Sequence, residues 1–526
     1  MTWTAVTAPL GSVWLSALAA AIPLAVLFGL LAWGRLPGWV PACAAVCASL
    51  VVALAAWGMP AIPALSSGLQ GAASAFFPIL WIVVSALWVH SLCVESGQFS
   101  VIKATLGSIS SDRRLQALFI AFAFGAFLEG AAGFGTPVAI SAALLVGLGF
   151  EARAAATLCL IANSSPVAFA AAGVPVVVAA GVSGIDVAVL SRIVGRQVSL
   201  LSLIIPVWLC VALAGWRRSL EVLPALLVAG LIMSVTQFLI ASFSGPWAAG
   251  ILSGIATMAG LWLFLRAWKP RRVWDFPGAE APGAPRAPAA PPRAALRAWT
   301  PYLLMSLLVL LWSAAPVKAF LQRGDISFPW PGLGGTTFTL PLFSTPGTAI
   351  FFSAALSALF LPNVGPGRAL ACLGRTVRGL CGTILTVCLV LATAYVMNAS
   401  GMSGALGRAL AATGAFFPLF SPLLGWLGVL LTGSDTSSNA LFGSLQRTTA
   451  ERLGFNPGLM VAANASGGVA GKMISPQNIA VAAASACLEG QEGRIFRATV
   501  GHSVAMALLI GAITLLQAYC LPGTVD

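Results

Sequence analysis

A single carboxylate inside a long apolar stretch constrains what this chain can fold into. Glu129 follows an apolar run that begins near Leu115. Glycines at 130, 133 and 135 and Pro137 come directly after it, and the chain is then apolar up to Phe150. Glycine and proline free backbone groups that must find partners in hydrocarbon, and an ionised side chain there costs about 2.5 kcal/mol or more. A membrane protein tolerates both where a broken helix lines a polar cavity, as in transporter binding sites.

Apolar stretches of membrane-spanning length recur along the whole chain. Its 526 residues are 59% hydrophobic and only 8% charged, whereas soluble domains carry about 25% charged residues. Because a crossing needs about 20 apolar residues, we predict an all-α polytopic membrane protein with roughly 12–14 transmembrane segments. The net charge of +13 is then explained by Lys and Arg in cytoplasmic loops, and binding of nucleic acid is not expected.

A linker rich in proline and alanine divides the chain into two transmembrane halves. Residues 268–299 hold seven prolines and several basic residues, a composition typical of disordered or polyproline segments. We therefore predict a first half, a basic cytoplasmic linker and a second half at 1–267, 268–299 and 300–526. Polar interruptions predict a broken helix and then a helical hairpin in each half, at 115–149 and 154–181 in the first and at 415–447 and 457–488 in the second.

Short sequence matches relate the two halves to each other. Gly125-x-x-Leu128-Glu-Gly130 resembles Gly428-x-x-Leu431-Thr-Gly433, and Ala162-Asn163 and Pro175 recur as Ala463-Asn464 and Pro476. If the main basic loops are cytoplasmic, both termini lie outside the cell. The first broken helix then starts inside and the second starts outside. This pattern indicates an inverted repeat with its binding site at the broken helices.

Four polar interruptions are expected to meet near the middle of the membrane, at 129–137, 163–166, 433–439 and 472–478. Lys472 supplies a cation there, and helix N-termini exposed at the breaks offer N–H groups that favour an anion. Hydroxyl and amide side chains surround them. The sequence thus predicts a site for a small anion whose candidate binding residues are Lys472, Asn163, Gly133, Thr136, Thr436, Ser437, Ser438, Asn439, Gln477 and Asn478.

Each of these assignments has a structural alternative. Lys472 can pair with Glu129 or Asp435 simply to permit its own burial. Asp435 stands in a Ser-Asp-Thr sequence that is well suited to cap a helix. The serine, threonine and asparagine side chains can serve only to satisfy unwound backbone.

Three residues are candidates for carrying a proton, namely Glu129, Asp435 and His90. Removal from water favours the neutral form of a carboxyl group. We favour Glu129, because hydroxyl neighbours and a capping role would keep Asp435 ionised. His90 lies late in an apolar segment, where it can relay protons or simply mark the membrane interface.

No motif in the sequence indicates a cofactor, a metal or an enzyme. The ten cysteines lie mostly in apolar runs without zinc-ligand spacing, the phosphate-binding G-x-x-x-x-G-K-[ST] motif is absent, and no nucleophile stands near a general base.

Three stretches together resemble the bacterial L-lactate permease family, namely 125–140, 431–442 and 471–478. The resemblance implies a multi-pass transporter of the bacterial inner membrane that imports L-lactate, D-lactate and glycolate with protons. It also implies a fold of the ion-transporter type, with inverted repeats and an elevator movement, and a homodimer is compatible with it. The alternative is a sodium-coupled carrier of dicarboxylates. A doubly charged substrate calls for two cations, and only Lys472 lies in the interruptions.

Overall fold

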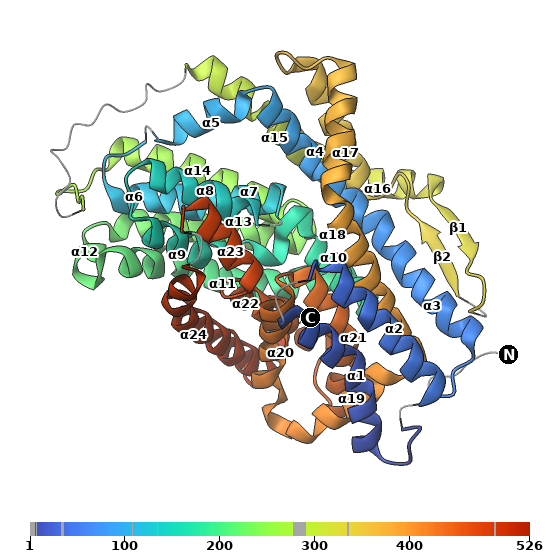
Figure 1. Ribbon diagram of the computed structural model, residues 1–526. Helices are drawn as coiled ribbons and strands as arrows, with labels where there is room; N and C mark the ends of the chain where they lie inside the picture. Colours follow the sequence, from blue (N-terminus) through green and yellow to red (C-terminus); the bar gives the residue numbers. More distant parts are fainter. Residues whose placement is uncertain are drawn as a thin grey trace.

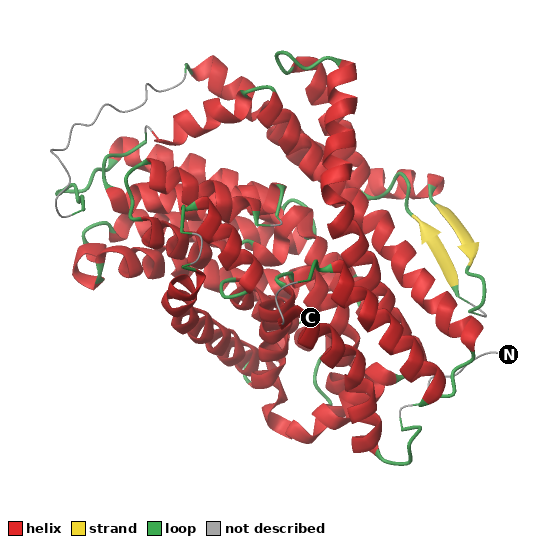
Figure 2. Cartoon of the chain, in the orientation of Figure 1, coloured by secondary structure: helices red, strands yellow, loops and turns green. Residues whose placement is uncertain are grey.

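The structure is a computed structural model that describes residues 6–525 except 7, 33–35, 108, 134, 277–290, 334–335 and 489–490. It consists almost entirely of helices, with one small antiparallel β-hairpin (Figure 2). Within the described residues, ten helices are long and apolar enough to cross a membrane, or eleven if one bent pair counts as a single crossing. Three shorter apolar helices add to these. The prediction of an all-α polytopic membrane protein is confirmed.

Long helices that pack side by side form one part of the molecule (Figure 1). The chain from Ala61 to Glu95 packs along α18, because Gly71 lets its backbone approach Leu391 and the indole of Trp88 donates to the carbonyl of Ala369 at 3.0 Å. These elements are α1 (Val13–Ala32), α2 (Trp39–Ala55), α3 (Ala61–Ser74), η1 (Ala75–Leu80), α4 (Trp81–Glu95), α17 (Pro346–Phe360) and α18 (Pro366–Ser400).

A helical hairpin, here called hairpin 1, follows in the other part of the molecule. Its first arm is α6 (Arg113–Ala117), η2 (Leu118–Phe124) and α7 (Gly125–Ala131), and its second arm is α8 (Thr136–Gly147). The guanidinium of Arg113 donates to the carbonyl of Leu148, and Ser141 Oγ donates to the carbonyl of Ile120 at 3.3 Å. The arms are therefore antiparallel and end side by side. The prediction that 115–149 crosses once as a broken helix is wrong, because Gly133 and Gly135, with φ of 60° and 81°, reverse the chain direction.

The next segment is a broken helix rather than the predicted hairpin over 154–181. It consists of α9 (Ala152–Asn163), η3 (Val167–Phe169) and α10 (Ala170–Ser183). The two helices are bent by 66° at the break, an angle too small to bring their far ends together. Positive φ values at Ala171, Ala172 and Gly173 reorient the chain after the break, and the chain continues away from the point where α9 begins.

The second half repeats this order of hairpin and broken helix. Hairpin 2 is α20 (Phe417–Thr432) and α21 (Asp435–Leu453), whose arms are joined by bonds from Ser421 Oγ to Gln446 Oε1 at 2.8 Å and from Ser438 Oγ to the carbonyl of Gly425 at 3.1 Å. The broken helix is α22 (Pro457–Lys472) and α23 (Pro476–Ser485), and α24 (Glu492–Tyr519) packs against both of its pieces. The assignments predicted at 415–447 and 457–488 are thus exchanged.

The two hairpins enter the protein from opposite ends. The broken helix α9–α10 begins next to the base of hairpin 1. It ends at Ser183, whose carbonyl accepts a 2.5 Å hydrogen bond from Arg447 near the base of hairpin 2. The tips of the hairpins therefore point toward each other. This is the arrangement that an inverted repeat produces, and the repeat itself stays a prediction.

The remaining elements surround these repeats or connect them. Hairpin 1 packs closely on α14, because a Cβ on Gly130 would lie 2.5 Å from the backbone nitrogen of Ile251. The remaining elements are α5 (Gln98–Gly107), α11 (Val187–Ala214), α12 (Trp216–Leu220), α13 (Leu223–Phe243), α14 (Ala249–Ala267), α15 (Pro292–Ser313), α16 (Ala315–Leu321), η4 (Gln322–Gly324), β1 (Ile326–Pro329), β2 (Thr337–Leu340), α19 (Met402–Leu410), η5 (Ala411–Phe416) and η6 (Pro522–Thr524).

The predicted linker is structured at both of its ends, and residues 277–290 lie outside the described part. Asp275 accepts a 2.9 Å hydrogen bond from Arg113 at the base of hairpin 1. Partial burial opposes the ionisation of Asp275, but the bonds from Arg113 and from the N–H of Phe276 hold its pKa below the ordinary value. The helix α15 begins at Pro292 rather than at residue 300, so the predicted boundary falls inside a helix.

Candidate functional site

A cavity of about 470 Å³ lies where the four interruptions meet. Both hairpin tips and both broken helices contribute to its wall, and α2 and α18 close it from the side of the long helices. Its principal polar lining residues are Glu129, Thr432, Ser434, Asp435, Thr436, Ser437, Lys472, Gln477 and Asn478, with Thr383 and Thr386 from α18. The structure thus brings together segments that lie hundreds of residues apart.

An ion pair between the two sequence halves forms one wall of this cavity. Lys472 Nζ, at the end of α22, donates to Glu129 Oε1 on α7 of hairpin 1. The amide of Asn163, at the end of α9, donates to the other oxygen, Glu129 Oε2, at 2.7 Å. All three residues are buried. Both oxygens of Glu129 therefore accept from N–H donors, which satisfies a buried carboxylate.

A second carboxylate in the same cavity has no such partners. Asp435 is 3% exposed, and neither of its carboxylate oxygens has a hydrogen-bond partner among the described residues. It does not cap α21, because the cap is Ser434, whose hydroxyl accepts from the N–H of Ser437 at 3.3 Å. Its carboxyl group packs against Gly468 of α22, where a Cβ would collide with it. One ground for preferring Glu129 as proton carrier is therefore wrong.

Helix N-termini converge on the cavity. The helix α21 begins at Asp435, and α23 begins at Pro476 behind the cap Ser475, whose hydroxyl accepts from the N–H of Asn478 at 3.4 Å. Residues at the first turns of both helices, Thr436, Ser437 and Gln477 among them, line the cavity. The positive ends of helix dipoles favour a bound anion.

Four of the predicted binding residues do not line the cavity. Ser438 joins the two arms of hairpin 2, and Gly133 packs against Ala171. The amide of Asn439 donates to the carbonyl of Pro175 at 3.1 Å, and its oxygen accepts from Asn464 at 2.9 Å. Asn163 acts on the site through Glu129. The side chain of Thr136 lies outside the described part of the structure.

His90 lies away from the cavity. Its Nδ1 is 3.0 Å from the hydroxyl of Tyr302 on α15, and its ring meets Phe99 edge-on with centroids 5.0 Å apart. His90 does not line the cavity. The structure thus does not bring this proton-carrying candidate into the site.

One face of α18 belongs to the site and was not predicted. Gly379, Gly382, Thr383 and Thr386 line the cavity, together with Trp39 at the start of α2. They recur at a spacing of three or four residues, which places them on one helix face. That run of small and hydroxylated residues within an apolar helix is the signal that could have found them.

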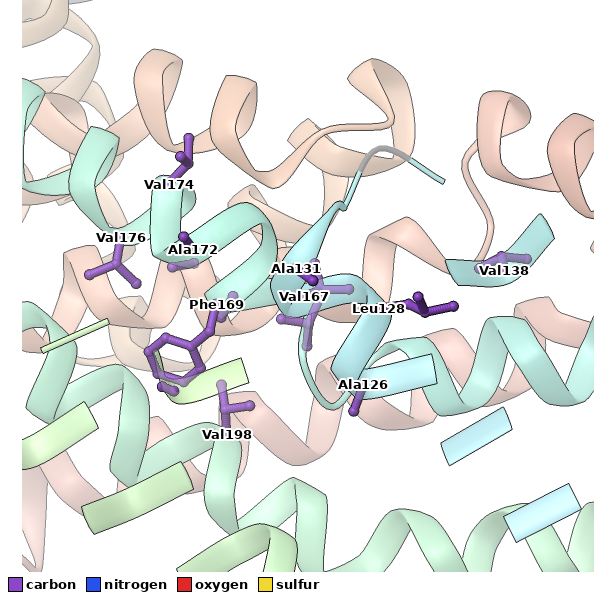
Figure 3. Close-up of a cluster of buried hydrophobic side chains, with 14 of the residues drawn as sticks. Ala126, Leu128, Ala131, Val138, Val167, Phe169, Ala172, Val174, Val176 and Val198 are labelled. Atoms are coloured by element: carbon purple, nitrogen blue, oxygen red, sulfur yellow. The ribbon is translucent and has the colours of Figure 1, made fainter. Parts of the chain in front are cut away.

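Buried apolar side chains pack around the tip of hairpin 1 and the break between α9 and α10. Figure 3 shows Leu128, Ala131, Val167, Phe169 and Ala172 near the tip of hairpin 1 and the break between α9 and α10. All of these residues are at most 1% exposed. An apolar surrounding of this kind strengthens the electrostatic interactions inside the cavity.

Comparisons with known proteins place the whole chain in one family. The family model described as L-lactate permease matches residues 16–331 and 333–521. The chain is 44% identical to the glycolate permease GlcA of Escherichia coli K12, over 99% of each chain, and 44% identical to the L-lactate permease of the same organism, over 98% of each chain. A solved structure of MtrF from Neisseria gonorrhoeae is similar with a TM-score of 0.47 at 12% identity, over 87% of this chain and 84% of that one. The chain is a multi-pass membrane protein of the L-lactate permease family.

Proposed function

We propose that this protein imports L-lactate, with D-lactate and glycolate as further substrates, together with protons across the bacterial inner membrane. The observation that carries the proposal is the cavity, where Lys472 is the single cationic side chain among the described lining residues. Relatives named for lactate and glycolate transport support this substrate class. One lysine suits a monocarboxylate, whereas a dicarboxylate calls for a second cation.

The substrate binds to Lys472 by displacing Glu129 from the ion pair. In the structure the carboxylate of Glu129 is paired with the ammonium group of Lys472. A lactate carboxylate entering the cavity takes this position on Lys472, beside the first turns of α21 and α23. Thr436, Ser437 and the amide of Gln477 lie within the same cavity and offer partners for the 2-hydroxyl group. The substrate thereby replaces an internal counter-ion rather than meeting an unpaired cation.

Proton coupling follows from the charge that the substrate carries. Moving lactate alone into the cell works against the membrane potential at about 2.3 kcal/mol per 100 mV. One proton taken up with each lactate cancels that charge. Two buried carboxyl groups line the cavity, Glu129 and Asp435, so the site contains groups that can take the proton.

The position of the cavity supports an elevator movement, and the basic residues at the base of hairpin 1 support an orientation of the protein in the membrane. The cavity lies between the hairpin tips on one side and α2 and α18 on the other, so sliding of the hairpins along α18 carries the site across the membrane. Arg113 and Arg114 lie at the base of hairpin 1, and Arg114 donates to the carbonyl of Arg218 at 2.6 Å. The positive-inside rule makes this base cytoplasmic and leaves both termini outside.

Uptake of labelled L-lactate into proteoliposomes tests the proposed function. A pH gradient and a sodium gradient are imposed separately, with the membrane potential clamped. We expect accumulation with an inward proton gradient and no stimulation by sodium. Accumulation that follows the sodium gradient alone, or transport of a dicarboxylate in preference to lactate, would contradict the proposal.

Filling the cavity from the side of α18 is expected to block transport without harming the fold. A Cβ built on Gly382 meets no heavy atom within 4 Å, so we expect the side chain of Gly382→Leu to extend into the cavity without displacing the backbone of α18. We expect lactate uptake to fall at least about tenfold, since displaced substrate contacts are worth ~1.4 kcal/mol or more. The matched control is Gly374→Leu on the same helix, which also has open space around it and does not line the cavity. Equal uptake by the two variants would exclude this face of α18 from the site.

A further inference from the structure

We propose that Asp435, rather than Glu129, is the residue that binds the co-transported proton. The inference rests on the proposed function and assigns one of its steps. It starts from the different surroundings of the two carboxyl groups that line the same cavity. Glu129 accepts from Lys472 and Asn163, whereas neither oxygen of Asp435 accepts a hydrogen bond from a described residue.

The neighbours of Glu129 are donors and stabilise its ionised form. A proton on Glu129 would need an acceptor. The side-chain groups that contact its oxygens, an ammonium and the amide nitrogen of Asn163, offer only hydrogens to it. Protonation of Glu129 would therefore break a bond that the structure makes. Glu129 suits the role of an internal counter-ion that holds Lys472 while the site is empty.

Neither carboxylate oxygen of Asp435 accepts a hydrogen bond from a described residue, so only the nearby charge of Lys472 and the neighbouring amide of Asn439 favour its ionised form. Its side chain is 3% exposed and packs against Gly468. Asn439, one turn further along α21, donates its amide to the carbonyl of Pro175. A buried carboxylate without hydrogen bonds is costly, and binding a proton removes that cost.

Few other charged groups face Asp435. Lys472 of α22 and Glu129 of hairpin 1 share its cavity, and the charge of Lys472 reaches it. The packed elements α10, α20 and η5 carry no ionisable side chain. The ionisable residues of α18 and α19, and the other ones of α21, do not line the cavity: Arg368, Cys372, Arg375, Arg378, Cys381, Cys388, Tyr395, Arg408, Arg447, Glu451 and Arg452.

A charge count gives the sequence of events. With Asp435 and Glu129 ionised and Lys472 protonated, the empty cavity carries one net negative charge. A lactate anion adds a second negative charge, and a proton bound by Asp435 restores the original charge. Outside the cell Asp435 takes a proton from water and becomes a neutral acid, and lactate then binds to Lys472. Inside, lactate and the proton leave, and Glu129 pairs with Lys472 again.

Equilibrium binding of labelled L-lactate to the purified protein tests this assignment across the acidic to neutral pH range. In the wild type, the coupled proton makes the Kd rise by about tenfold per pH unit above the pH at which the free protein ionises. We expect Asp435→Asn, which keeps the size of the side chain, to bind lactate with a Kd that no longer changes with pH. Glu129→Gln is expected to keep the pH dependence of the wild type. Asp435→Ser serves as a second variant if Asp435→Asn does not fold.

The outcomes separate this inference from the proposed function. Wild-type protein that binds no lactate overturns the proposed function itself. Unchanged pH dependence in Asp435→Asn or Asp435→Ser, or its loss in Glu129→Gln alone, overturns the assignment to Asp435. A lactate affinity that depends on sodium and loses that dependence in Asp435→Asn also overturns it, because Asp435 would then hold a cation other than the proton.

Discussion

Replacing Lys472 by methionine is expected to lower both the accumulation of lactate and its exchange across the membrane by roughly tenfold or more at limiting lactate concentrations. The substitution removes the single cation among the described residues that line the cavity. A hydrogen bond to a charged group contributes about 1.5–3 kcal/mol, so we expect the Kd for lactate to rise by roughly ten- to hundredfold. Uptake and counterflow of labelled lactate in proteoliposomes measure the effect.

Loss of stability has to be separated from loss of binding in this variant. Methionine at 472 leaves Glu129 buried without its partner, which costs about 3–5 kcal/mol in buried pairs. The double variant Lys472→Met, Glu129→Gln removes both charges and is expected to recover thermal stability but not binding. Arg375→Gln is the matched control, because it breaks an exposed pair with Glu95 and is expected to transport normally. Lactate binding by the double variant with wild-type affinity would remove Lys472 from the site.

Replacing Glu129 by glutamine is expected to abolish net accumulation of lactate while exchange of internal for external lactate continues. Glutamine frees Lys472 from its counter-ion, so lactate no longer competes with Glu129. We expect the Kd for lactate to fall by about tenfold, or ~1.4 kcal/mol. The empty carrier, however, would carry an unpaired buried lysine, and this state opposes the return step of net transport. Parallel measurements of pH-driven uptake and of counterflow separate the two modes.

The matched control for Glu129 is Glu151→Gln. Glu151 lies just outside hairpin 1 and pairs with Arg153 in an exposed position, so this variant is expected to accumulate lactate as the wild type does. Normal pH-driven accumulation by Glu129→Gln would show that the ion pair with Lys472 is not needed when the carrier is empty.

The sequence predicted where the site lies better than how the chain reaches it. Polar interruptions in apolar runs located Glu129, Asp435 and Lys472, because a charged side chain inside hydrocarbon costs free energy and is retained mainly where it has a function. The same interruptions did not distinguish a hairpin from a broken helix. That difference depends on the backbone angles of Gly133 and Gly135 and on the 66° bend after Asn163, and composition reports neither of them.

Contacts that composition does not report explain the remaining differences. Gly130 resembles a helix breaker in the sequence but lies within α7, where it allows close packing on α14. Asp435 resembles a helix cap, yet Ser434 takes that role. The sequence predicted Ser438 and Asn439 as substrate-binding residues, but they join helices instead. The partner is distant in the chain for Gly130, which packs on Ile251, and for Asn439, which bonds to Pro175. It is local for Ser434, whose hydroxyl accepts from the N–H of Ser437.

A cryo-EM structure of the protein with L-lactate at acidic pH would show whether lactate binds to Lys472 in place of Glu129. We expect the lactate carboxylate within hydrogen-bond distance of Lys472 Nζ, at the first turns of α21 and α23, with the bond from Lys472 to Glu129 broken. Lactate bound outside the cavity, with Lys472 still paired to Glu129, would contradict it.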